Sequence, residues 1–186
     1  MDWAKMLQAS VNLDRDIRIK HNLQNSLADR IQEAYISLDV ELAEIANAAE
    51  WFKVWKTHRG KRDGELSVHQ TVLNEFVDAI DFFLLMANLN QWNHLIVIGD
   101  EQLANYQSDQ RDLDLSLMYL NIKKMLFSTY SYNRGTDFQH AWHLFIKFGI
   151  QGLGFTPEEL EKAYFAKNQI NYQRQENNYW WFGSDV

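Results

Sequence analysis

Four acidic residues occur as two pairs with the same spacing, Glu41 with Glu44 and Glu75 with Asp78. Side chains three residues apart project from the same face of a helix, so each pair would place two carboxylates side by side. Both pairs border stripes of apolar residues, where an ionised carboxylate without a partner is costly. Carboxylate oxygens suit Mg²⁺ and Mn²⁺, which keep part of their water shell and bridge to phosphates. The pattern therefore predicts a divalent-metal site for a phosphate-bearing substrate.

A solvated helix face is the alternative explanation for such pairs, and it would suffice for a single Glu-x-x-Glu. Here the two pairs lie on consecutive predicted helices, joined by the polar loop KTHRGKRDGELS. If these helices are antiparallel neighbours, the pairs gather four carboxylates in one half-buried pocket. That arrangement favours the metal site.

Long helices are the expected elements, because the chain has a single proline and strand-type alternation is never sustained. The segment Thr156-Pro157-Glu158-Glu159 predicts a helix start, with Thr156 as the N-cap and Pro157 in the first position. We expect an all-α helical bundle of about six helices, at residues 3–19, 27–55, 71–89, 113–129, 138–148 and 157–176.

The composition fits one domain over residues 1–186, with 46% apolar residues and a net charge of −7. A chain this acidic is a poor candidate for binding nucleic acid, whose affinity comes largely from Lys and Arg on phosphates. There is no cysteine, which excludes disulfides and thiolate chemistry. No signal-peptide-like or membrane-spanning apolar run is present, so we expect a cytoplasmic protein with no membrane contact.

Beyond the acidic pairs, the chain resembles the dimeric-type all-α dUTP pyrophosphatases, within the wider group of MazG-like helical nucleotide pyrophosphohydrolases. The four pieces that carry the resemblance are LDRDIRIKHNL (13–23), ELAEIANAAEWFKVW (41–55), NEFVDAIDFFL (74–84) and YFAKNQINYQRQENNY (164–179). They occur in the family's order and reach both ends of the chain. Residues from about 93 to 155 match no part of the pattern, and we expect them to form a variable helical insertion.

The resemblance implies an enzyme that hydrolyses dUTP to dUMP and pyrophosphate, with Mg²⁺ (or Mn²⁺) held by Glu41, Glu44, Glu75 and Asp78. A metal-activated water would attack, and Glu44 would orient or deprotonate it. The resemblance also implies a homodimer and a small-molecule nucleotide as the partner. Two alternatives stay open: the same hydrolysis on another deoxynucleotide such as dCTP, and a catalytically silent helical partner protein.

Further residues match the family's nucleotide-binding positions. The resemblance assigns these to the phosphates or to the sugar and base: Lys53, Lys167, Asn171, Arg174, Asn47, Trp55 and Tyr179. Lys167, Asn171 and Arg174 are spaced four and three apart, so they share one helix face. That face could also be an ordinary solvated basic face, and Trp55 could be a core residue.

Three positions depart from the family pattern. Ser10 stands where a glutamine is usual, Asp81 where a histidine is usual, and Asn178 where a glycine precedes the closing tyrosine. The first two bear on recognition of the base. Elsewhere, His140 and His143 have metal-like spacing without a third ligand nearby in sequence, so we expect packing or surface roles for them.

Overall fold

The computed structural model describes residues 1–176, and these residues fold into helices without a strand. The α-helices are α1 (Trp3–Lys20), α2 (Leu27–Ala49), α3 (Val68–Leu89), α4 (Asp100–Ser108), α5 (Leu115–Tyr132), α6 (Gly135–Lys147) and α7 (Pro157–Glu176). A short 3₁₀ turn, Asn93–Leu95, precedes α4, and a π-helical turn, Phe148–Gly152, follows α6. The all-α prediction is confirmed, with seven helices in the described residues where about six were expected.

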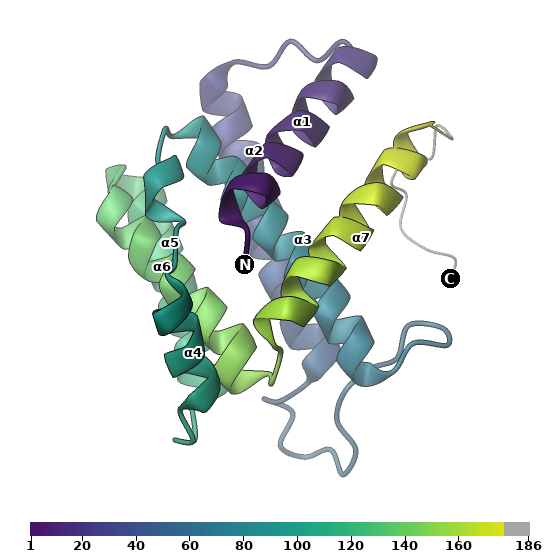
Figure 1. The fold of residues 1–186 in the computed structure, drawn as a ribbon, viewed down its shortest axis with the longest axis vertical. Coiled ribbons are helices and arrows are strands. Elements are labelled where there is room, and N and C mark those ends of the chain that lie inside the picture. Colours follow the sequence, from purple (N-terminus) through teal and green to yellow (C-terminus); the bar gives the residue numbers. More distant parts are fainter. Residues whose placement is uncertain (177–186) are drawn as a thin grey trace.

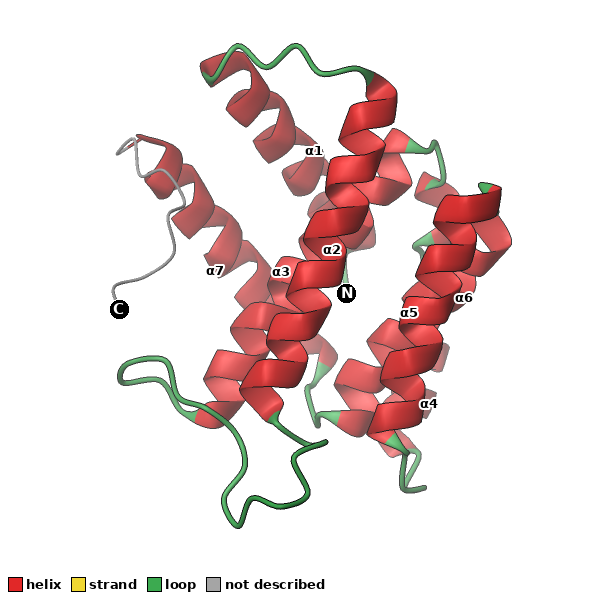
Figure 2. Cartoon of the chain, turned by 180° about the vertical axis from the view of Figure 1, so that it is seen from behind, coloured by secondary structure: helices red, strands yellow, loops and turns green. Residues whose placement is uncertain are grey.

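Helix α3 is the centre of the molecule. It packs against α1, α2 and α7 on one side, while α4, α5 and α6 form a separate group beside it (Figures 1 and 2). Aromatic rings join the two groups, because Phe145 of α6 stacks on Phe76 and Phe83 of α3 with ring centroids 4.1 Å and 4.9 Å apart. Large aromatic contacts of this kind dominate the energetics of a core. They fix α3, and with it the acidic pair that α3 carries.

The start of each helix near the acidic pairs is set by local hydrogen bonds. Helices α2 and α3 both begin with a capping box, formed by Ser26 with Asp29 and by Ser67 with Gln70. The predicted start of α7 is confirmed: the Thr156 hydroxyl accepts from the Glu159 N–H, and the Glu159 carboxylate accepts from the Thr156 N–H. Such caps satisfy amide groups that the first helical turn leaves unpaired.

The second helix is shorter than the sequence predicts. It ends at Ala49 rather than at Trp55, because Glu50 adopts a left-handed conformation (φ 54°) and its N–H bonds back to the Ala46 carbonyl. The buried Glu50 carboxylate then binds Lys53 and Lys56 of the following loop. The expectation of helix over residues 50–55 was wrong for this reason.

The segment from about 93 to 155 also differs in detail from the prediction. Helix α4 was missed because it has nine mostly polar residues and only one buried side chain, Leu103, so it shows no apolar periodicity. Helices α5 and α6 occupy the predicted places with shifted ends. No helix in residues 1–176 is long and apolar enough to cross a lipid bilayer.

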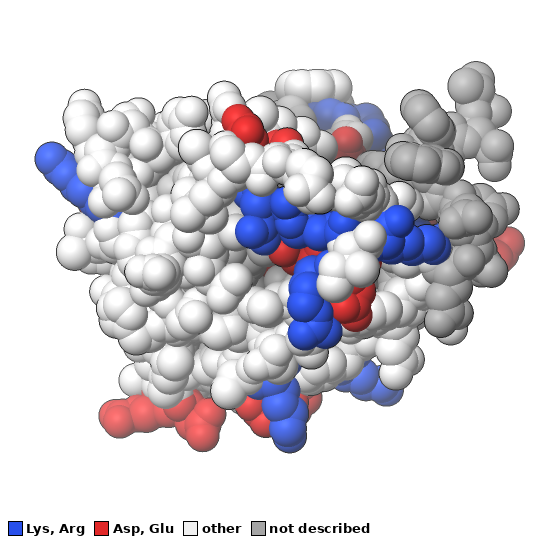
Figure 3. Space-filling view, turned by 90° about the horizontal axis from the view of Figure 1, so that it is seen from above, with Lys and Arg blue, Asp and Glu red and all other residues white. Residues whose placement is uncertain are grey.

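Charge is unevenly distributed over the surface. Seen from the end at which α1 and α7 finish, Lys and Arg side chains gather in the middle of the face and surround a few acidic ones (Figure 3). An ion pair between α1 and α2 lies in this part of the fold, Arg30 with Asp14 at 2.6 Å. The net negative charge of the chain therefore does not prevent an anionic ligand from meeting positive charge locally.

Candidate active site

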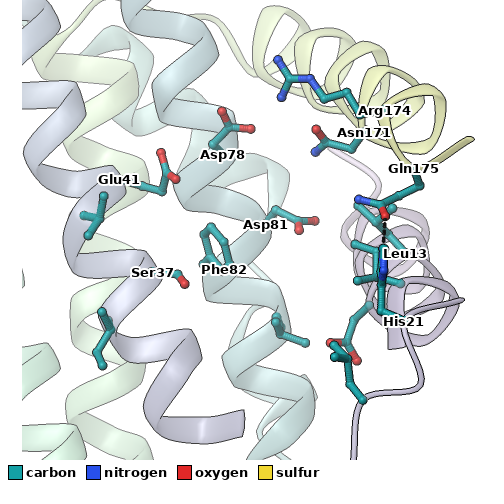
Figure 4. Close-up of a pocket in the computed structure, with 16 residues that line it drawn as sticks. Leu13, His21, Ser37, Glu41, Asp78, Asp81, Phe82, Asn171, Arg174 and Gln175 are labelled. Atoms are coloured by element: carbon teal, nitrogen blue, oxygen red, sulfur yellow. Dashed lines mark hydrogen bonds between the residues drawn. The ribbon is translucent and has the colours of Figure 1, made fainter. Parts of the chain in front are cut away.

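Three of the four predicted metal ligands come together between α2 and α3. Carboxylate oxygens of Glu41, Glu75 and Asp78 lie within 4.8 Å of one another, close enough to share a metal ion. Glu41 is 8% exposed, and Figure 4 shows it beside Asp78 in the space between the two helices. The two helices therefore bring the pairs side by side, as the sequence predicts. We call these three residues the acidic cluster.

The fourth predicted ligand, Glu44, lies at the edge of the acidic cluster. Its side chain is exposed, and its Oε2 accepts a hydrogen bond of 3.4 Å from the Asn47 side-chain amide. Glu44 is one helical turn beyond Glu41 on α2, and its charge still acts on Glu41 and on Glu75. It is thus near enough to contribute to the same site while keeping contact with water.

The electrostatics of the acidic cluster favour a cation. Burial, together with the neighbouring Asp78 and Glu75 charges, raises the pKa of Glu41 to about 7. Burial also raises the pKa of Glu75 and of Asp78, although the Lys167 ammonium, 2.6 Å from Asp78, opposes the shift of Asp78. One lysine does not balance three crowded carboxylates. The oxygen-only donor set and its unbalanced charge fit Mg²⁺ or Mn²⁺.

This crowding predicts that Glu41→Gln stabilises the metal-free protein at alkaline pH. The folded pKa of Glu41, about 7, lies above the unfolded value near 4.5, so the folded protein holds a proton that the unfolded chain has lost between these values. The free energy of unfolding therefore falls as the pH rises through this window. At pH 8 the glutamine variant should be more stable than the parent by about 1–3 kcal/mol, and at pH 5 the difference should nearly vanish.

Urea denaturation in the presence of a chelator, at pH 5 and at pH 8, measures this difference. Glu33→Gln is the matched control, because Glu33 is an exposed residue of the same helix. It should change stability by the same amount at both pH values. A Glu41→Gln effect of equal size at pH 5 and pH 8 would show that ionisation of Glu41 does not strain the fold.

A cavity of about 660 Å³ opens next to the acidic cluster, between α1, α2, α3 and α7. Its size is typical of pockets for small molecules. Glu41 and Asp78 lie at one end (Figure 4). Apolar side chains provide much of the rest: Leu13, Ile17, Leu23, Ile36, Val40, Phe82 and Leu85. The cavity thus joins an apolar compartment to a charged end, as a nucleoside with attached phosphates requires.

Helix α7 supplies the basic side of the cavity. Lys167 pairs with Asp78, and Asn171 and Arg174 line the cavity on the side facing α3 (Figure 4). The charge of Arg174 acts on Asp78 and, like that of Lys167, opposes the rise of its pKa. Nearer the end of α7, the Gln175 side chain hydrogen-bonds to His21, the residue that follows α1, at 2.9 Å. The three predicted phosphate-binding residues of α7 are therefore brought to the same side of the cavity.

Two of the positions that depart from the family pattern contact each other beside this cavity. Asp81 lines it, and the Ser10 hydroxyl donates to the main-chain oxygen of Asp81 at 3.2 Å. The Tyr164 hydroxyl lies 2.7 Å from the Asp81 carboxylate, and burial raises the pKa of Asp81 to about 6. Tyr164 was not singled out in the sequence, although it opens the last of the four matching pieces. A fixed carboxyl group therefore faces the compartment in which a base would lie.

The structure does not gather every predicted nucleotide-binding residue at the cavity. Lys53 binds Glu50, with 2.8 Å between Nζ and Oε1, and Trp55 is 73% exposed on the loop, so the core interpretation of Trp55 was wrong. Asn47 lies beside Glu44. Tyr179, like Asn178, lies outside the described residues. Sequence reasoning also missed Glu50, since nothing in its type or spacing distinguishes it from a surface glutamate.

The two histidines of α6 are separate from the acidic cluster. His143 Nδ1 lies 3.2 Å from the Gln102 side-chain amide, and burial lowers the pKa of His143. In residues 1–176, the acidic cluster alone offers three grouped metal-ligand side chains. His143 therefore packs between α6 and α4, in line with the expected packing role.

The chain matches a known protein family. A protein-family model described as dUTPase matches residues 2–179, which is nearly the whole chain. No curated protein matches the chain significantly. The matched range includes both acidic pairs, the cavity and all of α7.

Proposed function

Because the chain belongs to the dUTPase family and is therefore a nucleoside triphosphate pyrophosphohydrolase that hydrolyses dUTP, we propose that it does so with Mg²⁺, yielding dUMP and pyrophosphate. The observation that carries the metal assignment is the gathering of three carboxylates within 4.8 Å at the charged end of the cavity. Glu44 completes the proposed ligand set from the edge.

The residues around the cavity would have different roles in hydrolysis. Bound there, Mg²⁺ would neutralise charge on the phosphates and lower the pKa of the attacking water. Glu44 is exposed to water and is oriented by Asn47, so it is placed to accept the proton of that water. On the opposite side, Arg174 can grip a phosphate through two N–H groups, while Lys167 contributes a point charge. The deoxynucleoside would occupy the apolar compartment.

A nucleotide panel tests this proposal. The purified protein should release pyrophosphate from dUTP in the presence of Mg²⁺ and lose activity with a chelator. Asp81, which lines the cavity, favours a second candidate, hydrolysis of another deoxynucleotide such as dCTP, because a carboxylate can accept a hydrogen bond from an exocyclic amine. Faster turnover of dCTP than of dUTP would select that candidate. Absence of turnover on every nucleotide would reject the enzyme and leave a silent partner protein.

We also propose a homodimer that uses the exposed face of α5. Leu117, Leu120 and Phe127 are each more than half exposed and lie along one stripe of this helix. The large aromatic side chains of α6, Trp142 and Phe145, are buried in the core and take no part in this exposed face. Apolar patches of this kind often mark protein interfaces. Light scattering should give twice the chain mass, and a Phe127→Glu variant should give the single mass.

A further inference from the structure

The loop between α2 and α3, residues 50–67, carries five Lys and Arg residues, and two of them form ion pairs with Glu50. Glu50 is 1% exposed, and its carboxylate binds Lys53 Nζ at 2.8 Å and Lys56 Nζ at 2.7 Å. The two lysines hold the pKa of Glu50 down to about 2. They are therefore committed to a buried ion pair that shapes the loop.

The same glutamate fixes the returning half of the loop. Its Oε2 accepts from the Gly60 N–H at 3.2 Å, and the next residue, Lys61, donates its N–H to the Ala48 carbonyl at 2.8 Å. Gly60 has a φ of +93°, and a Cβ there would lie 2.3 Å from a methyl group of Val68. Glycine alone fits this backbone. Lys61 is thereby held against the last turn of α2.

The side chain of Lys61 is linked through the Asn47 amide to Glu44, at the edge of the acidic cluster. Its Nζ donates to Asn47 Oδ1 at 2.7 Å, and the Asn47 Nδ2 donates to Glu44 at 3.4 Å. On the α3 side of the same loop, the charge of Asp63 contributes to the raised pKa of Glu75. The loop thus closes the end of the site that lies opposite the apolar compartment.

The order of residues along α2 gives the direction of a bound nucleotide. Ser37 and Val40 line the cavity, Glu41 lies at its charged end, and Glu44 and Asn47 follow one and two turns later. From Glu41 to Asn47 the helix rises about 9 Å, comparable with the length of an extended triphosphate. A nucleotide with its base in the apolar compartment would therefore pass the carboxylates and end beside Asn47 and the ammonium of Lys61.

We propose that Lys61 binds the terminal phosphate of the nucleotide, and that Glu50, with Lys53 and Lys56, positions the loop for this contact. The inference rests on the proposed function. Hydrolysis adds the water oxygen to one phosphorus, breaks its bond to the bridging oxygen between the α- and β-phosphates, and yields dUMP and pyrophosphate. Lys61 holds the outer phosphate of that pyrophosphate. A compact ammonium on a flexible stem suits this task. When a phosphate oxygen replaces Asn47 Oδ1 as the acceptor, Lys61 keeps the same number of hydrogen bonds.

The test compares ligands that differ in their phosphates. With Mg²⁺, Lys61→Gln should weaken binding of the non-hydrolysable α,β-imido analogue of dUTP by about 10- to 100-fold, the scale of a hydrogen bond between charged groups. Binding of dUMP should be unchanged, because dUMP does not reach the loop. Lys61→Arg should restore most of the affinity for the analogue. Calorimetry provides both affinities.

Arg62→Gln is the matched control, since it removes the same charge from the neighbouring exposed residue. It should leave both affinities at the parent values. Equal loss for the analogue and for dUMP, or no loss for either, would overturn the role of Lys61. An equal loss of affinity in Arg62→Gln would show that the positive charge of the loop, and not a specific contact of Lys61, favours the analogue, and it would also overturn the proposal. Failure of the parent protein to bind or hydrolyse any nucleotide would instead sink the proposed function, on which this role depends.

Discussion

Replacing Glu44 with glutamine or Asp78 with asparagine should reduce the rate of dUTP hydrolysis by at least about 100-fold. Mutation of residues that only hydrogen-bond to metal ligands typically lowers metal affinity or activity by about 10- to 100-fold, and loss of a ligand itself should cost at least as much. Each substitution keeps the shape of the side chain and removes the charge that holds metal or accepts the proton of water. For Asp78 the loss also leaves Lys167 without its partner at 2.6 Å. Steady-state release of pyrophosphate at saturating Mg²⁺ measures the effect.

Two comparisons separate this loss from unfolding. Circular dichroism should show unchanged helix content, since α2 and α3 are fixed by their capping boxes and by the aromatic core. Glu33→Gln, which removes a carboxylate from an exposed position on α2, should retain the parent rate. Full turnover by Glu44→Gln at saturating Mg²⁺ would remove Glu44 from the proposed ligands and from the role of base.

Arg174→Lys should lower kcat/KM for dUTP by about 1–3 kcal/mol, although it conserves the charge. The guanidinium offers two parallel N–H groups to a phosphate, whereas an ammonium offers a single centre of charge. Arg174 lies on the cavity wall with Asn171 one turn before it, so its side chain can reach a phosphate at the charged end (Figure 4). The alanine variant should lose at least as much.

Lys162→Ala is the control for this series, because Lys162 is an exposed cation of the same helix and does not line the cavity. It should leave kcat/KM unaltered. Parent-like turnover of dUTP by both Arg174 variants would mean that α7 contributes to the structure and takes no part in binding the phosphates.

The elements that position the site were predictable where local signals exist. Thr156 and Pro157 mark the start of α7 through capping chemistry that depends on four consecutive residues. The end of α2 was not predictable, because Glu50 leaves the helix to form an ion pair with lysines three and six residues ahead. Nothing in the local sequence distinguishes this glutamate from one that continues a helix.

The acidic residues of the site were predictable from spacing, since an interval of three places two carboxylates on one helix face. The contacts made by Lys61 and Tyr164 were not. Lys61 reaches Asn47 only after the loop has returned along α2, and Tyr164 of α7 contacts Asp81 of α3, a residue 83 positions away in the chain. Such contacts depend on tertiary packing, which periodicity does not encode.

Calorimetric titration of Mg²⁺ in the presence of the α,β-imido analogue of dUTP tests most directly whether the acidic cluster is the metal site. At pH 8 the parent should bind Mg²⁺ saturably, and Asp78→Asn should bind it at least about 10-fold more weakly. At pH 6.5 Glu41 is largely protonated, because its pKa is about 7, so Mg²⁺ binding should release more protons in the parent than in Glu41→Gln, where only the phosphates of the analogue release them. Equal Mg²⁺ affinities in the parent and Asp78→Asn, with the same proton release in the parent and Glu41→Gln at pH 6.5, would contradict the assignment of the metal to this cluster.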